Sequence, residues 1–338
     1  MTASRIRVLA QQAGFELCGV APAGPIEDFE SYSQWVADGH AGAMTYLTGH
    51  RAALRADPRN LLPSARAVIV VGKLYNTPHP PDAISRYAWG DNYHLVLRQG
   101  LERLAGSLRE EYGDFEYRAC VDTAPLLERS LARLAGLGWI GKNTCLINQQ
   151  AGSWFFLGEL LVSLPLEPNP APPPDRCGTC TRCIDACPTS ALLPEGGLDA
   201  RLCISYLTIE LRGPVPGELC EGVGGLVFGC DICQDVCPWN RRAAVSLDPA
   251  FAPRNAGQPL EQLAALTPEE FRAKFRETPV WRAKYSGFLR NVAIAMGNAG
   301  DVRYRSHLER LASSGDATVA EHARSALRQL PSTIEVDG

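Results

Sequence analysis

The sequence predicts a three-part protein: an α/β domain over residues 1–165, a small cysteine-rich domain over 166–258, and α-helical HEAT-like repeats over 259–332. Strand and helix patterns alternate before residue 165, and nine of the twelve cysteines lie in the middle part, eight of them in two clusters. Helical periodicity dominates the last part. With 338 residues, 46% of them hydrophobic, the chain is long enough to fold around more than one core.

Hydrophobic periodicity and turn residues define the elements of the first part. Apolar residues at helical spacing predict a first helix that ends at Gly14, and a β-branched run predicts one buried strand. Pro125 is expected in the first turn of its helix. The expected order is helix 2–14, strand 15–22, helix 27–38, strand 67–71, helix 92–112, strand 116–121, helix 125–136 and strand 153–164.

A proline-rich stretch, PLEPNPAPPPD at 165–175, predicts an extended boundary after the first part. Beyond residue 259 the helical candidates are 260–266, 268–275, 288–296, 307–312 and 319–330, of which the last three are typical of stacked hairpins. Net charge is −4 overall, yet residues 281–330 hold eight Lys or Arg against four acids. That local excess of four is compatible with a phosphate-binding face or with a solvated helix face.

Two cysteine runs are the most informative feature of the chain. The first reads Cys-x-x-Cys-x-x-Cys-x-x-x-Cys-Pro from residue 177, the spacing of bacterial ferredoxins that bind [4Fe–4S] clusters. The second is shorter, and Cys203 between the runs completes a second set of four. Because the last cysteine of such a run ligates the other cluster, we predict two crossed ligand sets. They are Cys177, Cys180, Cys183 and Cys237 for one cluster, and Cys187, Cys203, Cys230 and Cys233 for the other.

Zinc or disulfides explain this pattern less well. Zinc favours separated Cys-x-x-Cys pairs and leaves the third cysteine and the Cys-Pro ending unexplained. The first twenty residues contain no long apolar signal region, and no window holds the roughly 18 apolar residues of a membrane span. We therefore expect a cytoplasmic protein in a reducing environment. Cys18, Cys120, Cys145 and Cys220 remain, and are interpreted as buried thiols.

Asp122 lies where a predicted strand ends, a position at which functional carboxylates are often displayed. The alternative is a turn or helix-capping aspartate. Lys142 follows a Gly-Trp-Ile-Gly turn and would meet either an anionic ligand or solvent. His94, in an aromatic loop that begins at Trp89, is interpreted as a packed or surface histidine. No Gly-x-Gly-x-x-Gly fingerprint or P-loop is present.

Together with the cysteine pattern, the segments RYAWGDNYH, VDTAPLLER, GWIGKNT and GSWFFLGELL resemble epoxyqueuosine reductases, cobalamin-dependent iron–sulfur enzymes of tRNA modification. The resemblance covers nearly the whole chain from Arg55 onward. It implies reduction of epoxyqueuosine to queuosine at the wobble position of tRNA. It also implies base-off cobalamin between the α/β domain and the clusters, an external flavodoxin- or ferredoxin-like electron donor, and no membrane partner. Nothing in the sequence demands a dimer, so a monomer is expected.

The resemblance also assigns roles to residues. Asp122 matches the proton donor, which requires a pocket that keeps its carboxyl protonated near neutral pH. Arg55, Lys142, Ser205 and Tyr206 are expected near the corrinoid. Ser85 replaces a cysteine found in some members, so a thiolate near cobalt is not required here. Arg303, Arg305 and Arg324 are the candidates for tRNA phosphate contacts.

Two other functions stay open at this point. A corrinoid reductase of a small molecule, similar to a dehalogenase, would not need the basic C-terminal helices. A ferredoxin-type electron-transfer module would explain the cysteines but leave about 165 N-terminal residues without a role.

Overall fold

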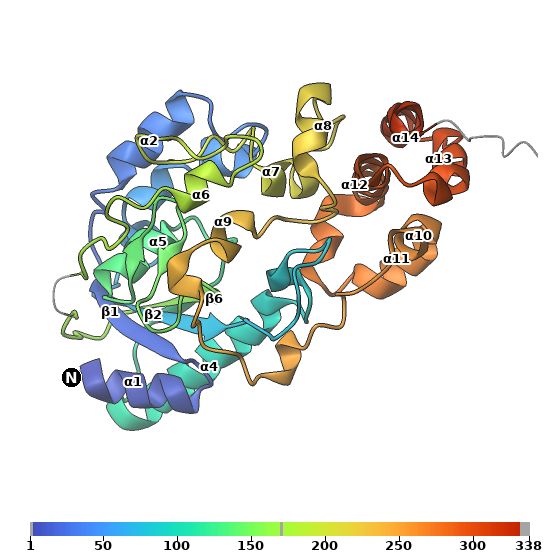
Figure 1. Cartoon of the computed structure of the whole chain (residues 1–338). Helices are drawn as coiled ribbons and strands as arrows, with labels where there is room; N and C mark the ends of the chain where they lie inside the picture. Colours follow the sequence, from blue (N-terminus) through green and yellow to red (C-terminus); the bar gives the residue numbers. More distant parts are fainter. Residues whose placement is uncertain (1–2, 170–171, 332–338) are drawn as a thin grey trace, which may run out of the picture.

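The computed structural model describes residues 3–169 and 172–331. Residue 2 of the first predicted helix, residues 170–171 of the proline-rich stretch and the last residue of the predicted helical part lie outside the described residues. The first part is built on a four-stranded sheet of order β1-β2-β6-β3 (Figure 1). Its strands are β1 Leu17–Pro22, β2 Ala67–Leu74, β6 Phe155–Val162 and β3 Tyr117–Cys120.

All three strand pairings in this sheet are antiparallel. The predicted alternation of strands and helices is present, but α/β in the strict sense, with a parallel sheet, does not describe it. Side chains of β2 alternate between the two faces: Ile69 and Val71 pack on one core, Val68 and Val70 on the other. Helices α1 Ala3–Gln12 and α4 Tyr93–Tyr112 cover the first face, and α5 Glu128–Leu134 covers the second.

Two local predictions in this part need correction. Helix α5 begins at Glu128, so Pro125 precedes the helix and does not occupy its first turn. Strands β4 Trp139–Ile140 and β5 Leu146–Ile147 form a short hairpin that the periodicity did not predict. The remaining elements before β6 are α2 Phe29–Ala37, α3 Thr45–Thr48, and the 3-10 turns η1 Ala53–Ala56, η2 Pro58–Asn60 and η3 Arg86–Ala88.

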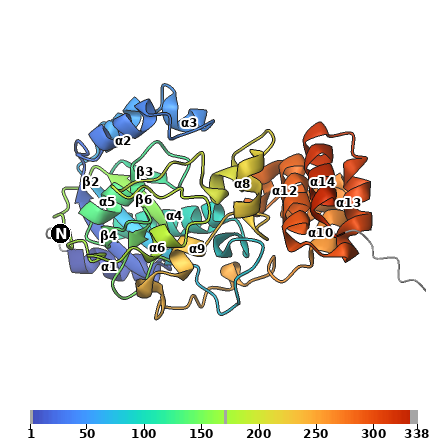
Figure 2. The ribbon, with the colours of Figure 1, turned by 45° about the horizontal axis from the view of Figure 1, so that its top comes forward.

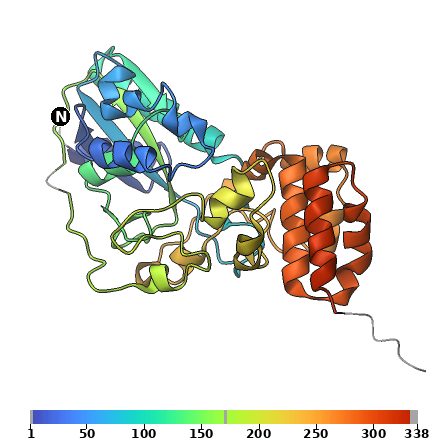
Figure 3. The same ribbon diagram turned by 90° about the horizontal axis from the view of Figure 1, so that it is seen from above.

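The cysteine-rich part consists of short helices joined by loops, and it lies between the sheet and the C-terminal helices (Figure 3). Each cysteine run contains one helical turn, and a proline after its last cysteine ends the run. The elements are α6 Arg182–Asp185, α7 Ile204–Ile209, α8 Gly217–Val223, α9 Ile232–Asp235, η4 Pro238–Asn240 and η5 Pro249–Phe251.

The C-terminal helices stack side by side at the end of the molecule away from the sheet (Figure 2). Thr267 opens α11 with a capping box, in which its hydroxyl and the Glu270 carboxylate satisfy each other's backbone N–H groups. The elements are α10 Leu260–Ala265, α11 Pro268–Phe275, η6 Pro279–Ala283, α12 Lys284–Ala299, η7 Val302–Tyr304, α13 Arg305–Ala312 and α14 Ala317–Gln329.

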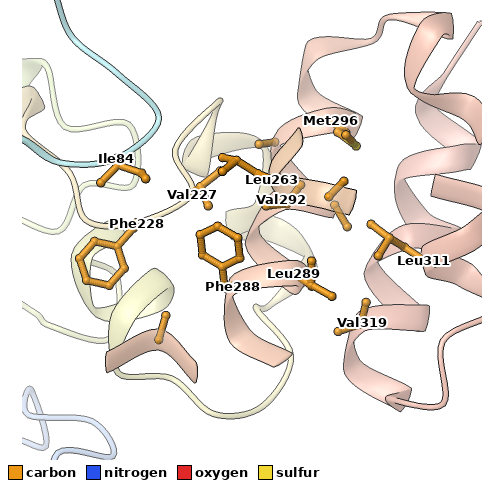
Figure 4. Close-up of a cluster of buried hydrophobic side chains, with 14 of the residues drawn as sticks. Ile84, Val227, Phe228, Leu263, Phe288, Leu289, Val292, Met296, Leu311 and Val319 are labelled. Atoms are coloured by element: carbon orange, nitrogen blue, oxygen red, sulfur yellow. The ribbon is translucent and has the colours of Figure 1, made fainter. Parts of the chain in front are cut away.

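One hydrophobic core joins all three predicted parts (Figure 4). Phe288 and Val292 of α12 pack with Val227 and Phe228 of the cysteine-rich part and with Ile84 of the first part. Residues 243–256 also return to the sheet: Phe251 packs in its core, and Asp248 pairs with buried Lys73 at 3.0 Å. The predicted boundaries at 165 and 258 therefore separate stretches of sequence that share cores in space. No described helix is long and apolar enough to cross a membrane.

Candidate functional site

The cysteines line two cavities. One, of about 260 Å³, is bordered by Cys177, Cys180, Cys183 and Cys237. The other, of about 290 Å³, is bordered by Cys187, Cys203, Cys230 and Cys233. The structure thus brings together the two crossed sets that the spacing predicts, with the last cysteine of each run facing the other set.

The arrangement suits clusters better than single ions. Within the described residues, no three Cys, His, Asp or Glu side chains converge closely enough to hold one metal ion. A cubane binds its four thiolates at four different iron atoms, so its ligands stand further apart than those of a zinc ion. The two cysteine cavities therefore fit iron–sulfur clusters.

Lys142 belongs to the first cysteine cavity. Its Nζ donates hydrogen bonds to the carbonyl oxygens of Gly178 at 2.7 Å and Cys180 at 3.1 Å. The ammonium group thereby fixes the loop that carries the first two cysteines. Among the cavities formed by the described residues, Lys142 lines only this cysteine cavity, and its contact with a corrinoid stays a prediction.

A much larger cavity, of about 870 Å³, lies between α2, α5 and the turn that carries Arg55. Small-molecule sites span about 300–1,000 Å³, so this one accommodates a large ligand. Its walls combine apolar and aromatic surface with polar groups at the edge, as a flat amphipathic macrocycle requires. They include Tyr32, Trp35, Tyr46, Leu126, Leu127, Ile140, Ser31, Arg133 and Asp122.

The other predicted corrinoid contacts occupy three different places. Arg55 lines the large cavity and is buried, with its guanidinium donating to the carbonyl oxygens of Arg51 and Tyr46. Ser205 lines the second cysteine cavity. Tyr206 is buried beneath the turn before Tyr46, where its hydroxyl oxygen accepts the Ala43 N–H at 2.9 Å. Of the three, only Arg55 borders the large cavity.

Asp122 lies at the edge of the large cavity in a left-handed backbone conformation, with φ at 53°. That conformation is uncommon outside glycine and costs free energy, so it marks the position as one under constraint. The Asp122 Oδ2 accepts hydrogen bonds from the Tyr93 hydroxyl and from His94 Nε2, each at 3.0 Å. It caps no helix, since Leu127 occupies the N-cap of α5. The helix-capping alternative is therefore wrong, whereas the turn alternative is compatible with the structure, because Asp122 lies in a bend between β3 and α5.

The start of α4 sets the position of His94. Asn92 caps this helix, and its Oδ1 accepts the His94 backbone N–H at 3.1 Å. The same oxygen lies 2.9 Å from His94 Nδ1, so Nδ1 must be the donor there. Nε2 then faces the Asp122 carboxylate. One proton is consequently shared between His94 Nε2 and Asp122 Oδ2.

The electrostatics of Asp122 differ from the expectation. Burial raises the pKa of this carboxyl, but the His94 hydrogen bond and charge, together with the Tyr93 hydroxyl, outweigh it, so the pKa is lowered. The expected pocket, which keeps Asp122 protonated near neutral pH, is not what the structure shows.

A smaller cavity of about 370 Å³ continues from Asp122 toward the cysteines. Asp122, Glu128 and Arg129 border both it and the large cavity. Cys145 and Tyr87 border both it and the second cysteine cavity. The smaller cavity thus connects the large cavity, at Asp122, to the second cysteine cavity. The spacing of residues in the sequence did not predict this connection.

The unassigned cysteines fall into two kinds. Cys120 is buried, and burial raises the pKa of the Cys18 and Cys120 thiols to about 12, which makes them inert. Cys18, Cys145 and Cys220 are only partly buried, so the prediction of buried thiols holds in full for Cys120 alone, and Cys145 lies between two cavities. The sequence pointed to this position of Cys145 only through the Lys-Asn-Thr turn that directly precedes it.

The three arginines predicted to contact tRNA lie on or beside α13 and α14. Arg303 pairs with Asp301 at 2.9 Å, and Arg305 and Arg324 each donate one hydrogen bond to a nearby carbonyl. Closer to the cavity, exposed Arg282 of η6 lies over the Tyr46 ring, 5.2 Å from its centroid, and pairs with Glu210. Arg282 also lowers the pKa of Asp122 through its charge, in addition to the larger effects above, so η6 reaches the site.

Comparison with known proteins then identifies the family. Residues 55–123 match the family model "Epoxyqueuosine reductase QueG, DUF1730", and 176–240 match "4Fe-4S double cluster binding domain". The epoxyqueuosine reductase of Xanthomonas campestris is 42% identical over 97% of this chain and 96% of its own length. The chain belongs to the epoxyqueuosine reductase family. It is accordingly an oxidoreductase with a 4Fe–4S cluster-binding domain.

Two solved epoxyqueuosine reductases have the same fold. One, crystallised with an epoxyqueuosine-modified tRNA-Tyr stem loop, superimposes with a TM-score of 0.87 and is 29% identical over 96% of this chain and 89% of that one. Another, from Bacillus subtilis, has its aspartate catalytic loop swung out of the active site; its TM-score is 0.78, with 27% identity over 97% of this chain and 98% of that one.

Proposed function

We propose that this protein reduces epoxyqueuosine to queuosine at the wobble position of tRNA, the last step of queuosine biosynthesis. The observation that carries the proposal is the proton-sharing pair of Asp122 and His94, which opens on a large cavity continuous with a set of four cysteines. Membership of the epoxyqueuosine reductase family supports it, as does the family member crystallised with a modified tRNA stem loop.

We propose cobalamin for the large cavity and one [4Fe–4S] cluster for each cysteine cavity. Tyr32, Trp35 and Leu127 would pack against the macrocycle, and the Arg55 turn would close its edge. When bound, cobalamin supplies the two-electron reduction and the clusters supply electrons one at a time. An external donor, flavodoxin- or ferredoxin-like, would meet the first cysteine set, whose cavity is flanked by exposed Arg176 and Arg182.

The chain's own residues would manage protons and position the substrate. Converting an epoxide to an alkene releases its oxygen as water, which consumes two electrons and two protons. The Asp122–His94 pair would give the first proton to the departing oxygen, and Tyr93 would orient the carboxylate by its hydrogen bond. The strained backbone at Asp122 suits a loop that changes position, and the solved structure of the Bacillus subtilis enzyme has its aspartate catalytic loop swung out of the active site.

We propose that tRNA spans the cavity mouth and the C-terminal helices. Tyr46 and Arg282 would contact the anticodon loop, because both lie at the mouth and present an aromatic face and a cation. Arg303, Arg305 and Arg324 would contact backbone phosphates farther along the stem. The protein would act in the cytoplasm as a monomer, with a catalytic part at 1–165, a cluster part at 166–258 and a tRNA-binding HEAT-like part at 259–332.

The test is direct. The anaerobically purified protein, loaded with cobalamin and a low-potential reductant, is mixed with tRNA that contains epoxyqueuosine, and nucleosides are measured by mass spectrometry. The proposal expects queuosine to appear only when enzyme, corrinoid and reductant are all present. A protein that carries iron and corrinoid yet leaves epoxyqueuosine unchanged would refute it.

A further inference from the structure

Glu159 is an unusual residue for the centre of a sheet. It lies on β6 between Val70 of β2 and Cys120 of β3, on the face covered by α5. The side chain is 0% exposed, and within the described part of the chain its carboxyl oxygens meet no donor other than the Glu128 carboxyl. Burying a carboxyl group with no cation or N–H donor is costly, and native structures rarely keep one without a role.

Glu128, in the first turn of α5, faces Glu159 across this core. Its Oε1 accepts the backbone N–H of Asp122 at 2.6 Å, and its side chain borders both cavities that Asp122 borders. Glu128 therefore connects the buried carboxyl to the space in which the Asp122 carboxylate lies. The other groups that act on the pair are Asp122, Arg129, Cys120 and Tyr93.

Two carboxyl groups in this setting cannot both ionise near neutral pH. Burial and the Asp122 carboxylate raise the pKa of Glu128 to about 8. Burial and then the charge of Glu128 raise the pKa of Glu159 well above its ordinary range. Arg129 opposes these effects at Glu128 but does not cancel them. The pair therefore keeps at least one proton at the pH of the cell.

The chemistry needs such a proton. Epoxide, two electrons and two protons give alkene and water, and the Asp122–His94 pair holds only one shared proton. We propose that Glu128 and Glu159 form a buried carboxyl pair that stores the second proton and releases it through Glu128 to the Asp122 side of the cavity. This inference rests on the proposed function, and both residues lie outside the set that the sequence indicated.

Infrared spectroscopy tests the store without any turnover. Substrate-free holoenzyme at neutral pH is expected to show the absorption of protonated carboxyl groups, which Glu159→Gln and Glu128→Gln each reduce. Glu110→Gln, an exposed residue on α4, is the matched control and should leave the spectrum unchanged. If Glu159→Gln leaves the protonated-carboxyl absorption intact, the pair holds no proton and the proposal is overturned.

Turnover tests the use of the proton. Glutamine keeps the oxygen that accepts the Asp122 N–H but cannot store a proton, so Glu128→Gln separates storage from positioning. We expect kcat to fall by about tenfold or more with KM for tRNA and iron content unchanged, and the wild-type rate to decline above about pH 8. Wild-type kcat in both variants would overturn the proposal. Because wild type is assayed alongside, absence of queuosine from wild type identifies a failure of the proposed function instead.

Discussion

Asp122 and His94 act together because a helix cap fixes one of them. The Asn92 Oδ1 accepts a hydrogen bond from His94 Nδ1, which leaves Nε2 to share a proton with Asp122. A carboxyl group with a lowered pKa is ionised near neutral pH and has no proton of its own to give, so the proton that it shares with His94 Nε2 is what the pair can donate.

Replacing His94 by Gln tests whether the proton shared with Asp122 is needed for turnover. Glutamine still donates a hydrogen bond to Asp122 but carries no transferable proton, so turnover is expected to fall by about 10²-fold. Corrinoid content, iron content and tRNA affinity should match wild type. The measurement is queuosine formation in single-turnover conditions as a function of pH; a rate and pH profile equal to wild type would assign the proton to another group.

The buried carboxyls also affect stability. The unfolded chain releases the Glu128 proton near pH 4.5, whereas the folded protein keeps it up to about pH 8. Between these values the folded state binds more protons, so the free energy of unfolding falls as pH rises, by up to about 1.4 kcal/mol per pH unit. Glu128→Gln should flatten this dependence between about pH 6 and about pH 8, while Glu110→Gln retains it. Denaturant unfolding at several pH values measures the slope, and identical slopes in all three proteins would contradict the assignment.

Helix α12 is the element that ties the cysteine-rich part to the C-terminal helices. Arg290 is 0% exposed and donates hydrogen bonds to the carbonyl oxygens of Leu207, Leu211 and Gly213. Asn291 donates to the carbonyl oxygens of Thr208 and Val227. These side chains satisfy the irregular backbone that follows Cys203, where no sheet or long helix is available to do so.

Arg290→Met should therefore disturb the second cysteine set. The change removes the donors for the carbonyl groups of Leu207, which is buried, and of Leu211 and Gly213, which are part-buried; each unsatisfied buried group costs about 1–3 kcal/mol. We expect a clear loss of thermal stability and a loss of iron from one cluster, measured by calorimetry and iron analysis. Arg328→Met, at an exposed position of α14, is the control. Full iron content and stability in Arg290→Met would show that α12 does not support this segment.

At the scale of elements, the sequence predicted what is local. Cys-x-x-Cys spacing determines which thiolates share a loop. Helical periodicity located α4, which buries one face, and the apolar run 288–296 located α12, which is buried on all sides from Gly287 to Gly297. The sequence did not predict contacts between distant segments, because these depend on tertiary packing. Examples are the antiparallel register of β6 with β2 and β3, and the contact of His94 with Asp122. The contacts of Lys142 also depend on tertiary packing, because its position before a loop carries no information about which carbonyl groups it will meet.

As a whole, the molecule places its chemistry at one end and its stacked helices at the other (Figures 2 and 3). The shared core of Ile84, Phe228 and Phe288 holds the two ends in a fixed relation. A tRNA stem loop is long enough to extend from the cavity mouth to basic helices at a distance. The local positive charge near the end of the chain suits that geometry despite the net charge of −4.

Charge reversal on these helices tests whether their arginines bind tRNA. Changing Arg303, Arg305 and Arg324 to Glu should weaken tRNA binding and lower its salt dependence, by about 0.9 or less in slope for each lost phosphate contact. Arg7, Arg66 and Arg98, exposed on the sheet part, provide a control with the same change in charge. Titrations at several salt concentrations make the comparison. Equal affinity and slope for the two triple variants would show that the C-terminal arginines are merely solvated.

The central claim is that Asp122 delivers a proton to the epoxide oxygen inside the shared cavity, and Asp122→Asn tests it most directly. The amide keeps the size of the side chain but cannot release a proton. We measure queuosine formed per enzyme, with corrinoid, iron and bound tRNA determined on the same sample. The account predicts normal loading and binding with turnover reduced by about 10²-fold or more. Turnover close to wild type in a fully loaded Asp122→Asn enzyme would contradict it.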